Sequence, residues 1–303
     1  MAAGLRALFS RAPLETRDGV LEFVDVGDDY CDNFGRQWNL FRSVQIDSES
    51  LQVESAARFF AETGWQASDL GGKVILDAGC GAGRFSEVAV RAGARLVAID
   101  LSSAAYACAK TLEKQGSGDY IVARANIFDL PLRHGSFDGI YSLGVLQHTP
   151  DPLGAIRALV PFLKPGGRLA TWIYELGRFD YRPLLPRTWI RHATASWPSE
   201  RKLVLSKLLT AAFFPAGWGL SWLGRWGERA AFFLPYAARH HFGRGDLARQ
   251  WSYSLMDTFD WYGPLYDDPQ READIVRTME SAGLVNIRRL PARGMAIVGE
   301  RSV

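Results

Sequence analysis

The sequence predicts an α/β fold in which helices cover both faces of a mostly parallel sheet. Between residue 72 and about residue 174, short apolar runs alternate with segments of helical periodicity, a pattern typical of βαβ units. The first apolar run leads into a helix through a glycine-rich turn, as strands of parallel sheets often do. After about residue 250 the chain returns to this alternating character, so we expect its last part to complete the same sheet.

The expected elements follow in order along the chain. A hairpin is predicted around residues 20–24, and the next helix carries Phe34, Trp38 and Phe41 at spacings of four and three. A further helix is expected near residues 270–282. The predicted strands of the sheet are residues 74–77, 96–100, 121–125, 137–143, 167–173, 284–290 and 295–300.

Four segments are predicted. Residues 1–60 form an N-terminal extension, and residues 61–175 form the core of the sheet domain. Residues 176–250 are rich in aromatic side chains and are interrupted by five prolines, so we expect an inserted helical cap there. Residues 251–303 are predicted to be the C-terminal part of the core.

The turn after the first core strand is the most informative motif. Within KVILDAGCGAGRFS, residues 73–86, glycines at 79, 81 and 83 allow the backbone to turn tightly and to approach a ligand closely. A dinucleotide-binding fingerprint would need its third glycine at position 84, where this chain has Arg84, so an NAD site is disfavoured. A plain strand-to-helix connection without a ligand is the alternative.

LDAGCGAGR, residues 76–84, resembles the first motif of class I methyltransferases that use S-adenosylmethionine (SAM). Residues 123–132, 136–152 and 164–169 resemble later motifs of that family, in the same order. The resemblance is to small-molecule methyltransferases of the ubiquinone-biosynthesis type, and it covers the core and the C-terminal strands but not the cap. It implies a Rossmann-like sheet of seven strands with the last one antiparallel, and SAM across the carboxyl ends of strands one, two and four.

The same resemblance implies a set of cofactor-binding residues. Asp77 lies near the methionine end of SAM, whose ammonium group pairs with a carboxylate. Asp100 accepts hydrogen bonds from the ribose hydroxyls, or alternatively supports the next helix together with Ser102 and Ser103. Asn126 stands where the family usually has an acid that meets the adenine amino group, and an amide oxygen can still accept that bond. The predicted cofactor-binding residues of the core are Asp77, Gly79, Cys80, Gly81, Gly83, Asp100, Leu101, Asn126, Ile127 and Leu143.

Residues 34–47 and 257–270 resemble segments that flank the SAM site in a bacterial subgroup of the family. We expect the extension to close over the cofactor through Gln37 and Trp38, because aromatic faces stabilise a sulfonium group. Hydrophobic docking of the extension on the core is the alternative. Some relatives carry a cysteine-rich zinc module here, but the matching region has only Cys31, so no metal is expected.

Methyl transfer from SAM is a displacement at carbon, so alignment of the reactants and exclusion of water can supply much of the catalysis. His148, in the loop after the fourth core strand, is the predicted general base, and a structural hydrogen bond is its alternative role. Tyr174 and Tyr262 are further catalytic candidates. The first ends strand five, and the second lies in the segment expected to line the acceptor pocket.

The cap contains an uncharged run, residues 208–224, that is shorter than the ~20 residues of a membrane span and is broken by Pro215. Trp218, Trp222 and Trp226 follow one another at a spacing of four. Residues 208–226 therefore suggest peripheral contact with a membrane, a lid over an apolar substrate, or plain core packing. Residues 176–250 hold 12 Lys/Arg and 4 Asp/Glu, which favours an anionic or amphiphilic acceptor.

Motifs and composition together predict SAM-dependent methyl transfer to a small-molecule acceptor. A net charge of +2 and the lack of an N/D-P-P-Y/F motif disfavour a nucleic-acid partner. Cys31, Cys80 and Cys108 form no C-x-x-C pair, and the N-terminus has no signal-peptide pattern, so a cytoplasmic location is expected. A catalytically silent SAM-fold scaffold or membrane-surface partner is the alternative function, and the oligomeric state stays open.

Overall fold

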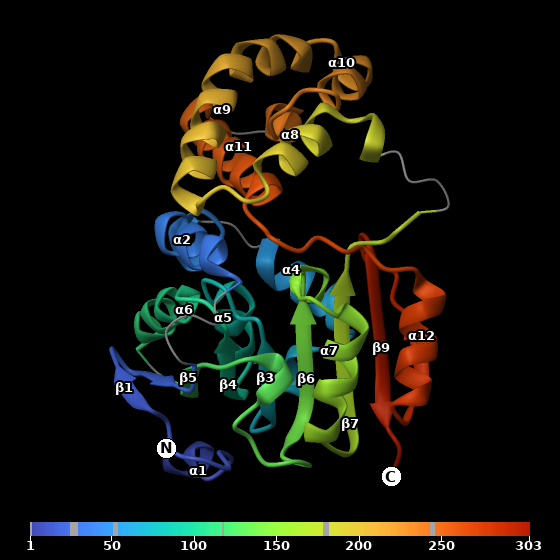
Figure 1. Cartoon of the computed structure of the whole chain (residues 1–303). Coiled ribbons are helices and arrows are strands. Elements are labelled where there is room, and N and C mark those ends of the chain that lie inside the picture. Colours follow the sequence, from blue (N-terminus) through green and yellow to red (C-terminus); the bar gives the residue numbers. More distant parts are fainter. Residues whose placement is uncertain (1, 25–29, 51–53, 117, 178–181, 243–245) are drawn as a thin grey trace. The chain divides into compact units, whose positions relative to one another are not determined.

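The computed structural model describes residues 2–24, 30–50, 54–116, 118–177, 182–242 and 246–303. The chain forms two compact units (Figure 1). The sheet unit comprises Met1–Cys31, Trp38–Gly177 and Tyr266–Val303, and the helical unit comprises Asp32–Gln37 and Arg178–Leu265. The helical unit extends beyond residue 250, the predicted end of the cap, because helix α11 (Leu247–Tyr262) continues across that boundary.

One mixed sheet runs through the sheet unit, with the strand order β1-β2-β5-β4-β3-β6-β7-β9-β8. Its central strands are parallel, whereas β9 is antiparallel to both β7 and β8. All seven predicted strands are present, and β7 begins earlier than expected. The strands are β1 (Glu15–Arg17), β2 (Val20–Glu22), β3 (Val74–Ala78), β4 (Arg95–Asp100), β5 (Asp119–Arg124), β6 (Phe137–Leu143), β7 (Leu163–Ile173), β8 (Leu284–Arg289) and β9 (Met295–Arg301).

The predicted count of seven strands is wrong, since the described part of the chain contributes nine strands to the sheet. The N-terminal hairpin supplies the other two: β2 pairs in parallel with β5, with Val20 opposite Val122. Because β5 would otherwise end the sheet with unpaired backbone groups, the hairpin satisfies an open edge. The sequence predicts a hairpin around residues 20–24, and the observed strands are residues 15–17 and 20–22. Its pairing with β5 has no local signal in the sequence.

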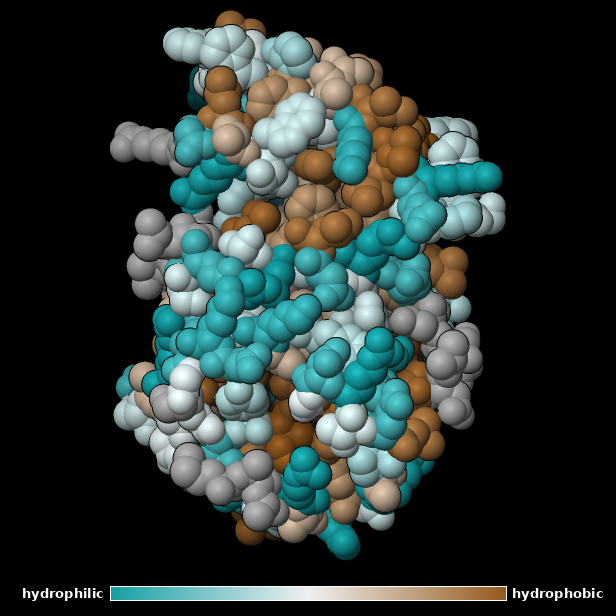
Figure 2. Space-filling model, turned by 90° about the vertical axis from the view of Figure 1, so that its left-hand side faces the viewer, coloured by the Kyte–Doolittle hydropathy of each residue, from teal (hydrophilic) through white to brown (hydrophobic). Residues whose placement is uncertain are grey.

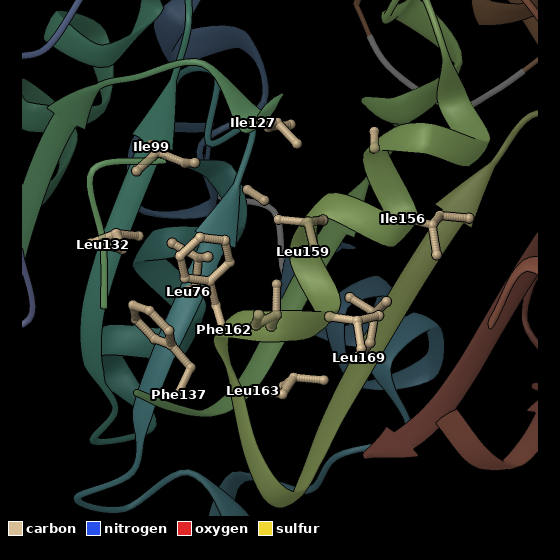
Figure 3. Close-up of a cluster of buried hydrophobic side chains, with 14 of the residues drawn as sticks. Leu76, Ile99, Ile127, Leu132, Phe137, Ile156, Leu159, Phe162, Leu163 and Leu169 are labelled. Atoms are coloured by element: carbon tan, nitrogen blue, oxygen red, sulfur yellow. The ribbon is translucent and has the colours of Figure 1, made fainter. Parts of the chain in front are cut away.

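Alternate residues of the central strands contribute to two hydrophobic cores, one on each face of the sheet. On β3, Leu76 and Ala78 belong to the first core and Ile75 to the second. Figure 3 shows part of the first core, which also holds residues of α1 (Ala2–Arg6), α7 (Pro152–Leu159) and α12 (Glu272–Ser281). The second core holds residues of α4 (Glu54–Thr63), which follows the short α3 (Asp47–Ser50), of α5 (Arg84–Arg91) and of α6 (Ala104–Glu113). Helices therefore cover both faces, as predicted.

The helical unit consists of α8 (Pro186–Thr194), α9 (Ser199–Ser221), α10 (Gly224–Ala231), α11 and the first part of α2 (Asp32–Leu40). Its small core gathers around Tyr236, whose hydroxyl lies 2.8 Å from Nε2 of the buried His241. Gly217 of α9 passes so closely that a Cβ atom there would lie 1.7 Å from this hydroxyl. Burial lowers the pKa of His241, which favours the neutral ring in this contact.

Candidate functional site

The glycine-rich turn lies between the carboxyl end of β3 and the first turn of α5. Its backbone is anchored on the neighbouring strand, because the N–H groups of Gly79 and Cys80 both donate to the carbonyl of Ile99 at 2.8 Å. Gly79 has a φ of +92°, and a Cβ atom there would lie 2.4 Å from the side chain of Val145. Glycine has no Cβ atom, so it avoids both the backbone strain of a positive φ and the clash with Val145. The turn therefore places backbone without side chains at the edge where β3 and its neighbours end.

Asp77 lies near the carboxyl end of β3 and is buried, with only 3% of the residue exposed. Its Oδ2 atom accepts hydrogen bonds from the hydroxyls of Ser86 at 2.6 Å and Tyr141 at 2.7 Å. Among the residues that the structure describes, no group donates to the other oxygen, Oδ1. Burial, with a smaller contribution from the charge of Asp100, raises the pKa of Asp77 to about 7. A cationic ligand group beside this carboxylate would reverse that shift.

Asp100, at the end of β4, ties the glycine turn to the turn before α6. Its Oδ2 atom accepts from the N–H of Gly81 at 2.9 Å, and Oδ1 accepts from the N–H and the hydroxyl of Ser102 at 2.9 and 2.7 Å. The Ser102 hydroxyl in turn accepts from the N–H of Ala104, where α6 begins. Asp100 therefore supports the next helix, the alternative to ribose binding. Oδ2, with one donor among the described residues, keeps a lone pair for a ligand hydroxyl.

Asn126 follows β5 and begins the 3-10 turn Ile127–Asp129. Its side-chain oxygen accepts a hydrogen bond from the N–H of Phe128 at 3.0 Å and so caps this turn. The second lone pair of this oxygen is available for the predicted bond to the adenine amino group. Leu101 and Leu143 are buried at the ends of β4 and β6, and Ile127 is buried after β5. All three therefore lie toward the carboxyl ends of their strands, where the adenosine site is predicted.

Trp38 lies against the glycine turn, since a Cβ atom on Gly81 would be 3.2 Å from its indole nitrogen. The indole also packs on Ala82. Gln37 belongs to the helical unit, where its amide nitrogen donates to Oδ1 of Asp260 at 3.0 Å. Its oxygen has no partner among the described residues. The contacts of Trp38 are those of hydrophobic docking on the core, the alternative role, and the Gln37 amide is hydrogen-bonded inside the helical unit.

His148 ends the 3-10 turn that follows β6, and its Nδ1 atom lies 3.0 Å from the backbone oxygen of Tyr266. Because a carbonyl oxygen only accepts, Nδ1 carries the proton of the neutral ring and Nε2 is the basic nitrogen. The ring stands edge-on to Tyr174, with 5.5 Å between centroids. The N–H of Gln270 donates to the carbonyl of Tyr174 at 2.9 Å, which holds residues 266–270 beside both side chains. The structure therefore brings His148 and Tyr174 together.

Tyr262, the third predicted catalytic residue, lies near the end of α11 in the helical unit. Its hydroxyl donates to the backbone oxygen of Pro235 at 2.7 Å, and the side chain is 1% exposed. Burial raises the pKa of Tyr262, so the hydroxyl stays protonated and is a poor proton acceptor. The visible role of Tyr262 is to hold α11 to the segment before Tyr236.

Gln147, which is not among the predicted site residues, has a buried side chain without hydrogen-bond partners in the described part of the chain. The side chain is fully buried beside His148, and neither its amide nitrogen nor its oxygen has a partner among the described residues. Burying an unsatisfied polar group costs about 1–3 kcal/mol, so such a residue points to a ligand or to water. Its signal in the sequence is a polar residue directly after the apolar stretch LGVL, residues 143–146, and next to His148.

The arrangement of the cysteines and of the other side chains that can bind metals is known for the described residues. Across them, no group of three or more His, Cys, Asp and Glu side chains is arranged to hold a metal ion. In the described part of the chain, no disulfide bond joins Cys31, Cys80 and Cys108. Burial raises the pKa of Cys80, in the glycine turn, well above its ordinary value, so this thiol stays protonated and contributes packing volume.

Comparison with known proteins finds a family match within the sheet unit. Residues 76–171 match a family model described as "Methyltransferase domain". The chain carries a methyltransferase domain. The match begins in β3 and ends in β7, so this domain includes the glycine turn, Asp100, Asn126 and His148.

Curated relatives resemble about a third of the chain. Ubiquinone biosynthesis O-methyltransferase of Xanthomonas oryzae pv. oryzae (strain PXO99A) is 42% identical over 104 residues, which make up 33% of this chain and 43% of the relative. The protein of the same name from Xanthomonas campestris pv. campestris (strain B100) is 43% identical over 103 residues, or 33% and 42%. The chain therefore spans less than half the length of these relatives.

A solved structure with the same fold is phosphoethanolamine N-methyltransferase 2 from Haemonchus contortus, in complex with SAM. It superposes with a TM-score of 0.50 and 13% identity, and the likeness covers 88% of this chain and 46% of that one. At this identity the likeness concerns the fold alone. It agrees with the predicted Rossmann-like arrangement of the methyltransferase domain.

Proposed function

We propose that the methyltransferase domain binds SAM at the carboxyl edge of β3, β4 and β6 and transfers its methyl group to a small-molecule acceptor. The observation that carries the proposal is the pair of carboxylates, Asp77 and Asp100, that bracket the glycine turn. Asp77 presents Oδ1 without a donor among the described residues, and its raised pKa indicates a site that gains from a nearby cation. The ammonium group of SAM supplies that charge.

The other predicted residues fit the remaining parts of SAM. Oδ2 of Asp100 accepts from a ribose hydroxyl while it keeps its bond to the N–H of Gly81. Asn126 accepts from the adenine amino group with its second lone pair, and Ile127 packs against the base. Trp38, placed against the glycine turn, faces the sulfonium, which aromatic rings stabilise. The adenosine end therefore lies over β4 and β5, and the methionine end over β3.

We infer an oxygen atom of a small molecule as the methyl acceptor, because the curated relatives are named as O-methyltransferases. SAM supplies an electrophilic methyl group and leaves as S-adenosylhomocysteine (SAH). The oxygen of the acceptor hydroxyl bonds to the methyl carbon while the bond between that carbon and the sulfur of SAM breaks. Nε2 of His148 takes the proton that the hydroxyl loses. Tyr174 and the carbonyl of Tyr266 hold the imidazole ring in place. The basic surplus of residues 176–250 favours an anionic or amphiphilic acceptor.

Calorimetric titration with SAH tests the cofactor assignment, with NADH as the competing dinucleotide. We expect SAH to bind and NADH not to bind. Asp77→Asn should weaken SAH at least about tenfold, because it removes a charge-assisted hydrogen bond. Asp129→Asn is the matched control, since Asp129 pairs with Arg11 on the surface at 2.6 Å. Unchanged SAH affinity in Asp77→Asn, or no binding by folded protein, would contradict the proposal.

Transfer of a labelled methyl group from SAM to a panel of phenols, catechols and carboxylic acids tests the reaction itself. For a phenolic acceptor, His148→Gln should lower kcat about 100-fold or more while SAH still binds, because general-base catalysis contributes roughly 10²–10⁴-fold. If the protein binds SAH tightly but labels no acceptor in the panel, methyl transfer fails and the silent scaffold becomes the better assignment.

A further inference from the structure

Helix α9 buries a stripe of polar residues and exposes several of its large apolar side chains. Lys202, Ser206 and Thr210, spaced by four residues, are at most 4% exposed. Val204 and Leu208, on the same turns of the helix, are 55% and 63% exposed. A surface helix of a water-soluble protein has the opposite arrangement, with its apolar stripe against the core. The outward face of α9 is therefore built for an apolar environment.

The aromatic residues at the end of α9 and in α10 extend this surface. Trp218, Trp222 and Trp226 are 41%, 76% and 64% exposed, and the rings of Trp218 and Trp222 lie 5.7 Å apart. Gly227 of α10 packs so tightly on α9 that a Cβ atom there would lie 1.8 Å from the backbone oxygen of Leu220. The two helices therefore pack closely and form one corner, and Figure 2 shows hydrophobic side chains gathered on the face of the helical unit in view.

Positive charge surrounds this aromatic corner. The guanidinium groups of Arg225 and Arg229 lie 5.4 and 5.2 Å from the centre of the Trp226 ring. Residues 176–250 as a whole carry 12 Lys/Arg against 4 Asp/Glu. Tryptophan rings and cations are the side chains that favour the boundary between lipid headgroups and acyl chains, and cations add attraction to anionic lipids.

We propose that the helical unit docks on an anionic lipid membrane through the outward faces of α9 and α10, with the tryptophans inserted at headgroup level. α9 is long and apolar enough to span a membrane by length and composition, and only 22% of its most apolar window is buried. Its inward face is nevertheless fastened to the helical unit, because Nζ of Lys202 donates to the backbone oxygen of Gly263 at 3.1 Å. The helix therefore lies along the membrane surface while the unit stays folded behind it.

Co-sedimentation with vesicles tests this docking, with phosphatidylcholine vesicles compared with vesicles that also contain phosphatidylglycerol. We expect the whole chain to bind the anionic vesicles at low salt and to be released at high salt. Replacing two exposed rings at once, Trp222→Ser with Trp226→Ser, should weaken binding at least about tenfold, since each ring buries a large apolar area. Leu14→Ser is the matched control, because Leu14 is 63% exposed in the sheet unit.

Three results would overturn the proposal. The first is no binding to anionic vesicles at low salt by protein whose circular dichroism shows it to be folded. The second is vesicle binding that the double tryptophan variant retains in full. The third is a concentration-dependent dimer in sedimentation velocity that the same variant abolishes, without vesicle binding, because the apolar face would then be covered by a second copy of the chain. None of these readouts depends on SAM binding.

Discussion

Helices α6 and α9 show how differently the two units use apolar side chains. In α6, Ala105, Cys108 and Leu112 are fully buried against the sheet. In α9 the buried side chains include the polar Ser206 and Thr210, whereas large apolar residues such as Val204 and Leu208 are exposed, although Phe213 and Phe214 pack on the core of the helical unit. The apolar face of α6 is therefore covered by the sheet, whereas part of the apolar surface of α9 is exposed.

This difference separates two tasks. The sheet unit surrounds Asp77 and Asp100 with buried side chains and backbone bonds, which fixes the polar groups of the predicted SAM site. The helical unit has a small core around Tyr236, and most of its tryptophans are exposed on the surface. A closed core around polar groups and an exposed apolar surface make opposite demands on packing, and in this chain they lie in different units.

Truncating matched leucines in α6 and α9 should give the largest difference between the two helices. Leu112→Ala should lower the free energy of unfolding by about 2–5 kcal/mol, because it leaves a cavity in a closed core. Leu208→Ala should change it by less than about 0.5 kcal/mol, since that side chain is 63% exposed. Urea denaturation followed by circular dichroism measures both. A large loss in Leu208→Ala would mean that the outward face of α9 is part of a core.

Matched glycines give the next largest contrast. Gly79→Ala places an alanine in the left-handed conformation, which destabilises the fold by roughly 1–2 kcal/mol, and its Cβ atom clashes with Val145. We therefore expect a clear fall in melting temperature and loss of SAH binding. Gly219→Ala in α9 places the new methyl group in open space, and should stabilise the helix by up to about 1 kcal/mol. Thermal melts with and without SAH measure both variants, and equal effects would contradict the assignment of the glycine turn as a ligand cradle.

The buried carboxyl group of Asp77 makes stability depend on pH. Its pKa is raised from 3.8 to about 7, so the folded protein favours the protonated form. The stability it contributes is fully present below about pH 4 and is lost as the pH rises to about 7, at no more than about 1.4 kcal/mol per pH unit. SAH, whose ammonium pairs with the ionised form, should bind more tightly as the pH rises over the same window.

Asp77→Asn is the control for both pH effects, because an amide keeps an acceptor for Ser86 and Tyr141 but does not titrate. Denaturation curves and SAH titrations between pH 5 and pH 8, on the native chain and on this variant, measure the difference. Parallel pH profiles in the two proteins would show that Asp77 is not the group responsible.

The smallest expected effect concerns Gln147. Gln147→Leu should raise the free energy of unfolding by about 1 kcal/mol, because it removes a buried amide without protein partners among the described residues. The same change should slow methyl transfer if the amide meets a ligand. Gln270→Leu is the contrasting variant: its amide donates to Asp268 at 2.8 Å, so its loss should destabilise the protein. Stabilisation without any change in turnover would leave Gln147 outside the site.

Much of the sheet unit could be predicted from the sequence, because the signals are local. The strands from β3 to β7 are short apolar runs bounded by turn residues, and both the glycine turn and Asp100 follow directly from the order of residues. The positions of His148 and Tyr174 at the ends of neighbouring strands follow from the rule that parallel strands end at one edge. Their contact through rings 5.5 Å apart needed the structure.

Other features depend on parts of the chain that are far apart, and no local pattern shows them. The hairpin joins the sheet only because β5 has an open edge, α11 crosses the predicted end of the cap because it packs with the helical unit, and Gln147 lacks partners only once the fold surrounds it. The sequence by itself determined the α/β class, the glycine turn and its two acids, because strand and turn preferences act between neighbouring residues. Only the tertiary structure decided which face of α9 is buried, because burial is a property of the assembled chain.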